Sequence, residues 1–346
     1  MGRRLLWGSL LLVPATAVLD LAVHPGRVTL FVVSALALVP LAWLIGESTE
    51  HAAEHTGPGI GGFLNASFGN APELIIALIA VSDLKWQVVR GSLAGSVVSN
   101  LLLVYGITQL AGPDRAPVDR RSLLTQVGLV GTAVLLFVWP SALGYTGDPE
   151  RHAVVVASIP VSIALLVLYL AVVGRNLRRH RRRARGGPSE GAWSLPGALG
   201  MLAVATGATA YVSAVLVHSL DAFAHAVGLS EFFIATVIVA IVGNAAEHGG
   251  AVVIARGGNM RLATEIAISS GAQVALLVVP VVMLLSLLFE HSLALSFRVV
   301  ELAAMAAGVA LAGGAVADGR SDRREGAVLV AAYGVVALAF FLAGNR

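Results

Sequence analysis

The chain has 346 residues, of which 57% are hydrophobic and only 12% are charged, about half the charged fraction of a soluble globular domain. It contains no cysteine, which excludes disulfides, zinc-thiolate sites, iron-sulfur clusters and cysteine nucleophiles, so that any metal would be bound through oxygen or imidazole. In so apolar a chain the net charge of +3 says less than the distribution of basic residues over the loops.

Apolar runs long enough to cross a bilayer, which takes about 20 residues each, recur along the chain and leave no stretch for a separate soluble domain. We therefore expect an all-α membrane protein with about eleven transmembrane helices. Charged residues, glycines and prolines between the runs predict helices near 5–23, 28–54, 60–82, 86–111, 121–143, 152–174, 195–227, 232–255, 261–289, 294–316 and 326–343. Two of these runs are long enough for tilted or broken helices, namely 28–54 and 195–227.

The amino terminus raises a question of processing. Arg3 and Arg4 precede an apolar stretch that is followed by Ala15-Thr16-Ala17, a sequence similar to a signal-peptide cleavage site. Because the apolar stretch continues to Val23, we favour a first helix that is retained in the membrane.

The strongest signal for topology is the segment 175–185, RNLRRHRRRAR, which carries seven arginines and no acid. Basic residues concentrate in cytoplasmic loops, so we expect this loop and the amino terminus inside and, after eleven spans, the carboxyl terminus outside. Binding to anionic lipid or nucleic acid is the alternative role of the loop; we favour a topology signal and expect no nucleic-acid partner. Arginine almost entirely replaces lysine, which suggests a GC-rich bacterial source and a cytoplasmic membrane.

The chain aligns with itself at an offset of 174 residues. Gly69-Asn70-Ala71-Pro72-Glu73 aligns with Gly243-Asn244-Ala245-Ala246-Glu247, and Leu102-Leu103-Val104 aligns with Leu276-Leu277-Val278. Each copy would hold five spans, an odd number, so the second copy enters the membrane in the opposite sense. The sequence therefore predicts two inverted five-helix repeats.

The domain organisation follows from this repeat. We expect an amino-terminal transmembrane helix in 1–25, a first repeat in 26–174, a basic cytoplasmic linker in 175–194 and a second repeat in 195–346. Inverted repeats place substrates near the bilayer midplane at their interface, which is where the two copies of the motif would meet.

The motif glutamates Glu73 and Glu247 are the candidate ion-binding groups. A charged glutamate in the membrane costs about 2.5–3.5 kcal/mol or more, and neither has a basic residue nearby in the sequence, so a cation or a proton is the expected partner. Calcium prefers carboxylate, amide and backbone carbonyl oxygens. Asn70 and Asn244 supply amides, while Gly69 and Gly243 loosen the helices and free backbone carbonyls.

The charges suggest how transport would be coupled. Two carboxylates neutralise one calcium ion or two protons, so the two occupied forms are equally neutral and compete for one site. We expect these neutral forms to move between the two sides in alternation. A helix-packing patch with satisfied core acids is the other interpretation, which two inverted copies make the weaker one.

At this point the residues resemble a known family. The stretch from Gly61 to Ala77 resembles the first signature of the calcium/proton antiporter branch of the calcium/cation antiporter superfamily, and Gly243 to His248 resembles the second. The resemblance covers nearly the whole chain. It implies exchange of calcium for protons, ligation of calcium by the motif glutamates and asparagines, and no cofactor beyond the transported ions. It also implies supporting or gating roles for Glu50, Ser96, Ser99, Asn100, Ser269, Ser270 and Gln273.

Three alternatives remain beside this interpretation. Pro72 stands where the branch usually has threonine and is similar to the sodium/calcium exchanger branch, which keeps sodium-driven exchange open. The segment from His51 to His55 fits the H-x-x-E-H pattern, whose histidines would ligate zinc in an intramembrane metalloprotease with Glu54 as base. His248 is either a proton relay or a packed polar residue. No oligomeric state is predicted.

Overall fold

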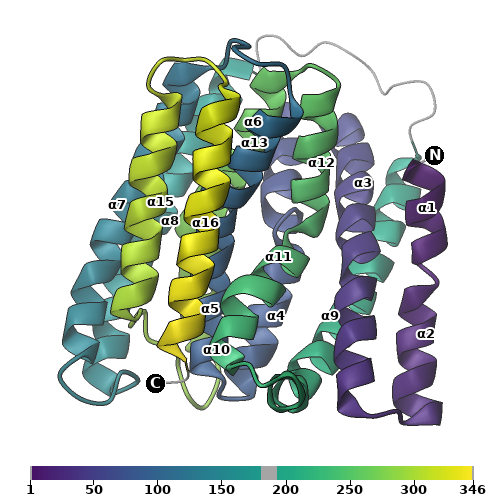
Figure 1. The fold of residues 1–346 in the computed structure, drawn as a ribbon. Helices are drawn as coiled ribbons and strands as arrows, with labels where there is room; N and C mark the ends of the chain where they lie inside the picture. The colour runs from purple at the N-terminus through teal and green to yellow at the C-terminus, as the bar shows by residue number, and fades with distance from the viewer. Residues whose placement is uncertain (1, 181–192, 345–346) are drawn as a thin grey trace.

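The structure, a computed structural model, describes residues 2–180 and 193–344, and these residues are almost entirely helical. Figure 1 shows the helices packed side by side, with the two chain ends at opposite ends of the bundle. The arginine-rich residues 181–192 of the predicted linker lie outside the described part. In chain order the elements are α1 (Gly2–Ser9), α2 (Leu12–Val18), η1 (Leu19–Val23), α3 (Arg27–Phe68), α4 (Ala71–Ser82), α5 (Trp86–Val98), η2 (Ser99–Val104), α6 (Tyr105–Ala111), α7 (Arg120–Gly144), α8 (His152–His180), α9 (Leu195–Val227), α10 (Glu231–Phe233), η3 (Ile234–Val239), α11 (Ala240–Gly243), α12 (Ala245–Arg256), α13 (Met260–Gln273), η4 (Val274–Val278), α14 (Val279–Ser286), α15 (Val299–Val316) and α16 (Arg323–Ala343).

The all-α membrane fold is confirmed, whereas the count of eleven spans is not. Among the described residues nine helices are long and apolar enough to cross a bilayer, or ten when the pair Glu231–Gly243 and Ala245–Arg256, bent by 57°, counts as one span. The predicted span at 60–82 accounts for the difference. There α3 continues to Phe68, and α4 is a separate short apolar helix. Glycine followed by an X-Pro pair interrupts a continuous helix at this place.

The two helix breaks have the same geometry. Asn70 precedes α4 with φ −100° and ψ 17°, and Asn244 precedes α12 with φ −95° and ψ 8°. Each motif glutamate is therefore the third residue of its helix. Two π-helical segments also lie within one residue of the repeat offset, since η2 begins at Ser99 and η4 at Val274, one residue after the position equivalent to Ser99. The equivalent motifs thus fold into equivalent local structures.

The long helices α3 and α9 make the most extensive contact between any two elements. Both lie next to α4, so the first motif helix packs against each of them. The amino-terminal helices cover α3 through an edge-to-face contact of Trp7 with Trp43, whose ring centroids are 5.4 Å apart. The Tyr211 hydroxyl of α9 donates to Asp20 at 2.8 Å, which adds a polar anchor.

A buried extended segment, residues 292–298, replaces the start of the helix predicted at 294–316, and α15 begins only at Val299. We call this segment the strap. Its central residues, 293–297, are all at most 5% exposed. Backbone without a helix is tolerated at such depth only when other groups in the protein satisfy its hydrogen bonds.

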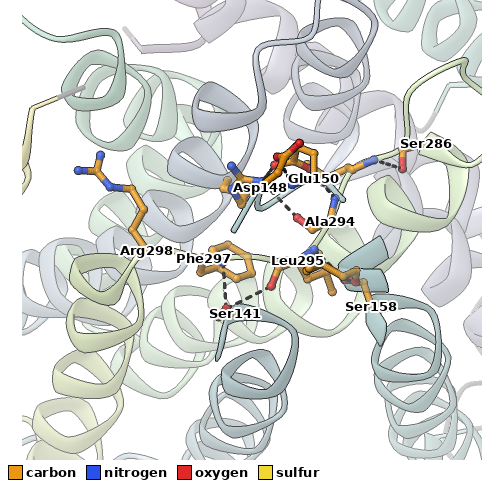
Figure 2. Close-up of polar contacts among 12 residues, drawn as sticks. Ser141, Asp148, Glu150, Ser158, Ser286, Ala294, Leu295, Phe297 and Arg298 are labelled. Carbon is orange, nitrogen blue, oxygen red and sulfur yellow. Dashed lines mark hydrogen bonds and ion pairs between the residues drawn. The ribbon is translucent and has the colours of Figure 1, made fainter. Parts of the chain in front are cut away.

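Side chains from distant elements supply those hydrogen bonds (Figure 2). The backbone N–H groups of Leu293, Ala294, Leu295 and Phe297 donate to Ser286 Oγ at 2.8 Å, Glu150 Oε2 at 3.0 Å, Ser158 Oγ at 2.9 Å and Ser141 Oγ at 2.9 Å. Arg90 forms an ion pair with Glu150 that is largely shielded from solvent. The strap is therefore extended because its hydrogen-bond partners lie on α7, α8 and α14 and in the loop before α8. All of these partners are outside 294–316, so the apolar pattern of that segment gives no sign of them.

Candidate ion-binding site

The two helix breaks place Glu73 and Glu247 next to each other at the interface of the two repeats. Their charges are close enough to interact. The Glu73 side chain lies over Gly243, the last residue of α11, because a Cβ atom built there would be 3.4 Å from Glu73 Cγ. A Cβ atom at 243 would be in ordinary van der Waals contact with Glu73, so this side chain packs directly against the end of α11.

Each motif asparagine is hydrogen-bonded to the opposite repeat. Asn70 donates from its amide to Gln273 Oε1 at 2.7 Å. Asn244 donates to Ser96 Oγ at 2.9 Å and accepts from the Asn100 amide at 3.3 Å. Asn70, Asn100 and Asn244 are at most 2% exposed. These bonds hold the two helix breaks together and fix the orientation of their amide groups.

The two glutamates have different surroundings. Ser270 donates its hydroxyl to Glu247, whereas Glu73 Oε2 is buried and has no hydrogen-bond partner among the described residues. Both carboxylates stand in the first turn of their helices, where the helix dipole favours negative charge. The arrangement therefore keeps one carboxylate oriented by a hydroxyl and leaves an oxygen of the other available.

A small cavity adjoins Glu73. It is lined by Glu73, Ile76, Ser92, Leu93, Ser96, Val239, Ala240 and Gly243. About 10 Å³ is available to the centre of a water molecule, which is close to the least that one water needs. A dehydrated ion or a single water fits such a space, and a hydrated ion does not.

Sequence reasoning missed Ser92. This serine is 7% exposed and lines the cavity one turn before Ser96, but its equivalent in the second repeat is Ile266. The internal repeat therefore gives no sign of this serine, because its polar side chain has no polar counterpart in the other copy. A polar residue spaced four positions before a motif serine on a helix was the available signal.

Other predicted site residues lie outside this network. Ser99 and Ser269 donate to carbonyls of their own helices, at 3.2 Å each. Glu50 is exposed on α3 and has no hydrogen bond or ion pair to the central groups within the described residues. His248 follows Glu247 on α12 and has a buried Nε2 without a hydrogen-bond partner in the described part. The structure thus groups the motif residues with Ser96, Asn100, Ser270 and Gln273. The other four predicted residues, Ser99, Ser269, Glu50 and His248, are not part of that group.

The histidines of the H-x-x-E-H segment face Trp193, which lies just before α9. The His51 ring stacks on Trp193 with a centroid distance of 4.7 Å, and His55 Nε2 lies 2.7 Å from the Trp193 carbonyl oxygen. In the described part of the chain no three histidine, aspartate or glutamate side chains are close enough to hold a metal ion together. These histidines join α3 to the residues before α9.

A helical membrane fold in which two broken helices bring their polar residues to one point is the architecture of a secondary transporter. The sodium/calcium exchanger protein family matches residues 27–177 and 197–342. The chain therefore belongs to this family, and its relatives place it in the calcium/proton antiporter branch.

The relatives and solved structures are similar over nearly their whole length. The Ca2+/H+ antiporter ChaA of Bacillus subtilis is 38% identical over 342 residues, covering 95% of this chain and 96% of ChaA. The Ca2+/H+ antiporter of Aphanothece halophytica is 33% identical, covering 97% of this chain and 95% of that protein. The structure of native YfkE superposes with a TM-score of 0.83 at 36% identity, covering 95% of this chain and 97% of that chain. The chain is an integral membrane transporter, and the metalloprotease interpretation is wrong.

Proposed function

We propose that this protein exchanges calcium for protons across a membrane at one site formed by Glu73 and Glu247. The observation that carries the proposal is the meeting of the two helix breaks. Each break presents a glutamate at the third position of its helix, and each is hydrogen-bonded through its asparagine to the other repeat. Relatives with 33–38% identity are Ca2+/H+ antiporters, which supports calcium and protons as the transported ions.

In this proposal the two carboxylates bind either one calcium ion or two protons. Calcium would take oxygens from Glu73 and Glu247, with amide, hydroxyl and backbone oxygens around them. Glu247 keeps its orientation through Ser270, and Glu73, whose Oε2 has no hydrogen-bond partner among the described residues, lines the adjacent cavity. The empty, doubly charged site is the costly state in the membrane, so alternation between sides proceeds with the site filled. No cofactor takes part.

Pro72 does not favour sodium over protons. It is the second residue of α4, where the helix needs no backbone N–H donor, so that proline, which lacks this group, is well tolerated. Helix geometry alone therefore accounts for proline in place of the usual threonine. We propose protons as the coupling ion because the relatives are Ca2+/H+ antiporters.

We further propose that the protein lies in a bacterial cytoplasmic membrane with its amino terminus inside. The amino terminus and the connection between α15 and α16 lie at one end of the bundle (Figure 1), and Arg320 lies in this connection while Arg323 begins α16. Basic residues mark the cytoplasmic end of membrane proteins. In this orientation α4 runs from the centre to the outer face, and α12 runs from the centre to the cytoplasm.

The test uses everted membrane vesicles with an imposed proton gradient. Glu73→Gln and Glu247→Gln should each lower calcium uptake at least about 100-fold, because each variant leaves one buried charge uncompensated. Glu290→Gln, a matched change at an exposed glutamate, should retain uptake. Full calcium/proton exchange in both site variants would refute the proposed site, and dependence of uptake on a sodium gradient would refute proton coupling.

A further inference from the structure

Three ion pairs join the turn between α4 and α5 to α9 and α10, and α10 lies at the end of the bundle opposite the amino terminus (Figure 1). The Lys85 ammonium pairs with Asp221 of α9 and lies 3.7 Å from Oε2 of Glu231 in α10. On the same turn, Oδ2 of Asp83 lies 3.2 Å from Nε2 of His218, which precedes Asp221 by one helical turn. We call these five side chains the outer latch.

Lys85 is the centre of the outer latch and the only lysine of the chain, whose other basic side chains are arginines and histidines. Its side chain is 16% exposed, while those of Asp221 and Glu231 are 49% and 33% exposed. Asp221 and Glu231 also lie within electrostatic reach of each other. One compact ammonium on a flexible stem therefore serves two carboxylates on different helices, which would repel each other without it.

The turn that carries Lys85 departs from the internal repeat in its residues but not in its shape. Leu84 has φ 60° and its equivalent Gly258 has φ 86°, and the same two backbone hydrogen bonds close both turns. This left-handed conformation is unfavourable for leucine and easy for glycine. Asp83 and Lys85 flank Leu84, whereas uncharged glycine and asparagine flank Gly258. The charges of the outer latch therefore belong to one end of the molecule, and the equivalent turn at the other end has none in their places.

The outer latch borders a surface pocket of about 530 Å³, which is lined by the turn after α4, by the start of α5 and by Glu231 of α10. The same stretches of chain, continued farther into the bundle through α4, α5, η3 and α11, line the small cavity beside Glu73. Midway along each stretch stands a completely buried residue, Ala80, Val89 or Ala235. Packed helices thus separate the pocket from the cavity, and the outer latch holds their outer ends together.

We propose that Lys85 is a positioning residue, which keeps the outer route to the central site closed as long as its ion pairs hold. The inference rests on the proposed function, because it concerns access from outside to the site of Glu73 and Glu247. The pocket and the cavity join when the turn after α4 parts from α9 and α10. Loss of the ammonium favours this step, since it leaves Asp221 and Glu231 to repel each other. Because the equivalent turn of the second repeat lacks these charges, the outer latch acts at one end only.

The test measures how fast a single cysteine beside the central cavity reacts from outside, which is possible because the chain has no cysteine of its own. Ser92→Cys reports on the cavity, and Glu290→Cys, exposed at the outer end, shows that the membrane-impermeant methanethiosulfonate reaches that side. Adding Lys85→Gln should raise the labelling rate of Ser92→Cys about fivefold, because two ion pairs of partly exposed groups are lost. Lys85→Arg, which keeps the charge, and Arg27→Gln, which removes an exposed arginine at the start of α3, should leave the rate within about twofold.

An exchange of charges separates loss of the ion pair from a general loosening of the fold. Lys85→Glu should speed up labelling of Ser92→Cys more than Lys85→Gln does, because three carboxylates then meet. Adding Asp221→Lys returns an ammonium between two acids and should restore the slow rate. If Lys85→Gln and Lys85→Glu leave labelling unchanged, or if the exchanged pair labels as fast as Lys85→Glu alone, Lys85 does not hold the route closed and the inference is wrong.

Calcium transport in vesicles of both orientations distinguishes a failure of the outer latch from a failure of the proposed function. In Lys85→Gln a shift toward the outward-open form should lower the calcium concentration for half-maximal transport from outside and raise it from the cytoplasm, whereas structural damage lowers only the rate. Unchanged labelling in Lys85→Gln, with uptake lost in Glu73→Gln and Glu247→Gln, would refute the outer latch alone. Faster labelling with full uptake in both glutamate variants would refute the proposed site and leave the outer latch standing.

Discussion

At the scale of single residues, the two motif glutamates are equivalent by the repeat but unequal in the folded protein. Glu247 accepts a hydrogen bond from the Ser270 hydroxyl, while Glu73 lines a cavity and its Oε2 has no hydrogen-bond partner within the described part of the chain. Ile76 and Ser92 are among the residues that line the cavity. In the proposed orientation both residues lie nearer to the outer face than the motif does. In the proposed orientation the spare volume beside Glu73 therefore lies toward the outer face, and we expect an ion from outside to pass Ser92 before it reaches Glu73.

Ser92→Ala should raise the calcium concentration for half-maximal transport from the outer side about fivefold, the effect of losing a hydrogen bond of about 1 kcal/mol. The same constant measured from the cytoplasmic side should stay unchanged, because the cavity does not extend there. Initial rates in right-side-out and everted vesicles give both values. Ile266→Ala, a purely apolar truncation at the equivalent position of the other repeat, serves as a control for local packing. Equal effects of Ser92→Ala from both sides would contradict the argument.

At the scale of elements, the helix breaks depend on residues that end and start helices. Pro72 occupies the second position of α4, so Pro72→Ala should keep calcium transport within about twofold and leave it coupled to protons. Ile75→Pro, a proline inside the same helix, should disrupt α4 at a cost of about 3 kcal/mol or more. Vesicle transport with and without sodium measures both variants, and sodium dependence appearing in Pro72→Ala would show that this residue selects the coupling ion.

The strap shows a different dependence, on side chains that satisfy a buried backbone. Ser158 accepts from Leu295 N–H and donates to its own helix, whereas Ser162 donates only to its own helix, at 2.9 Å. Ser158→Ala should therefore cost about 1–3 kcal/mol, since it leaves a buried N–H unpaired, and Ser162→Ala should cost less. Thermal unfolding of the two variants in detergent compares them directly. Equal melting temperatures would mean that Leu295 finds another partner.

At the scale of the whole molecule, the apolar runs and the repeat predicted the helical membrane fold and the two motifs that meet in it. The predicted domain boundaries stay predictions. The strap was mistaken for helix because Ala294 to Phe297 is apolar enough to continue α15, and three of its four side-chain partners lie more than a hundred residues earlier. Ser92 was missed because symmetry was the guide and its equivalent is Ile266. Long-range hydrogen bonds and departures from symmetry are set by tertiary packing, which a sequence pattern does not contain.

The sidedness of the whole molecule is a prediction that this chain allows to be tested cleanly, because it contains no cysteine. Arg256 and Glu290 are exposed at the end of α12 and after α14, which in the proposed orientation lie inside and outside. A membrane-impermeant maleimide should label Glu290→Cys in intact cells and spare Arg256→Cys, and everted vesicles should show the reverse. The positive-inside argument rests on arginines at one end of the bundle. Labelling of Arg256→Cys in intact cells would reverse the orientation, and with it the assignment of Glu73 to the outer route.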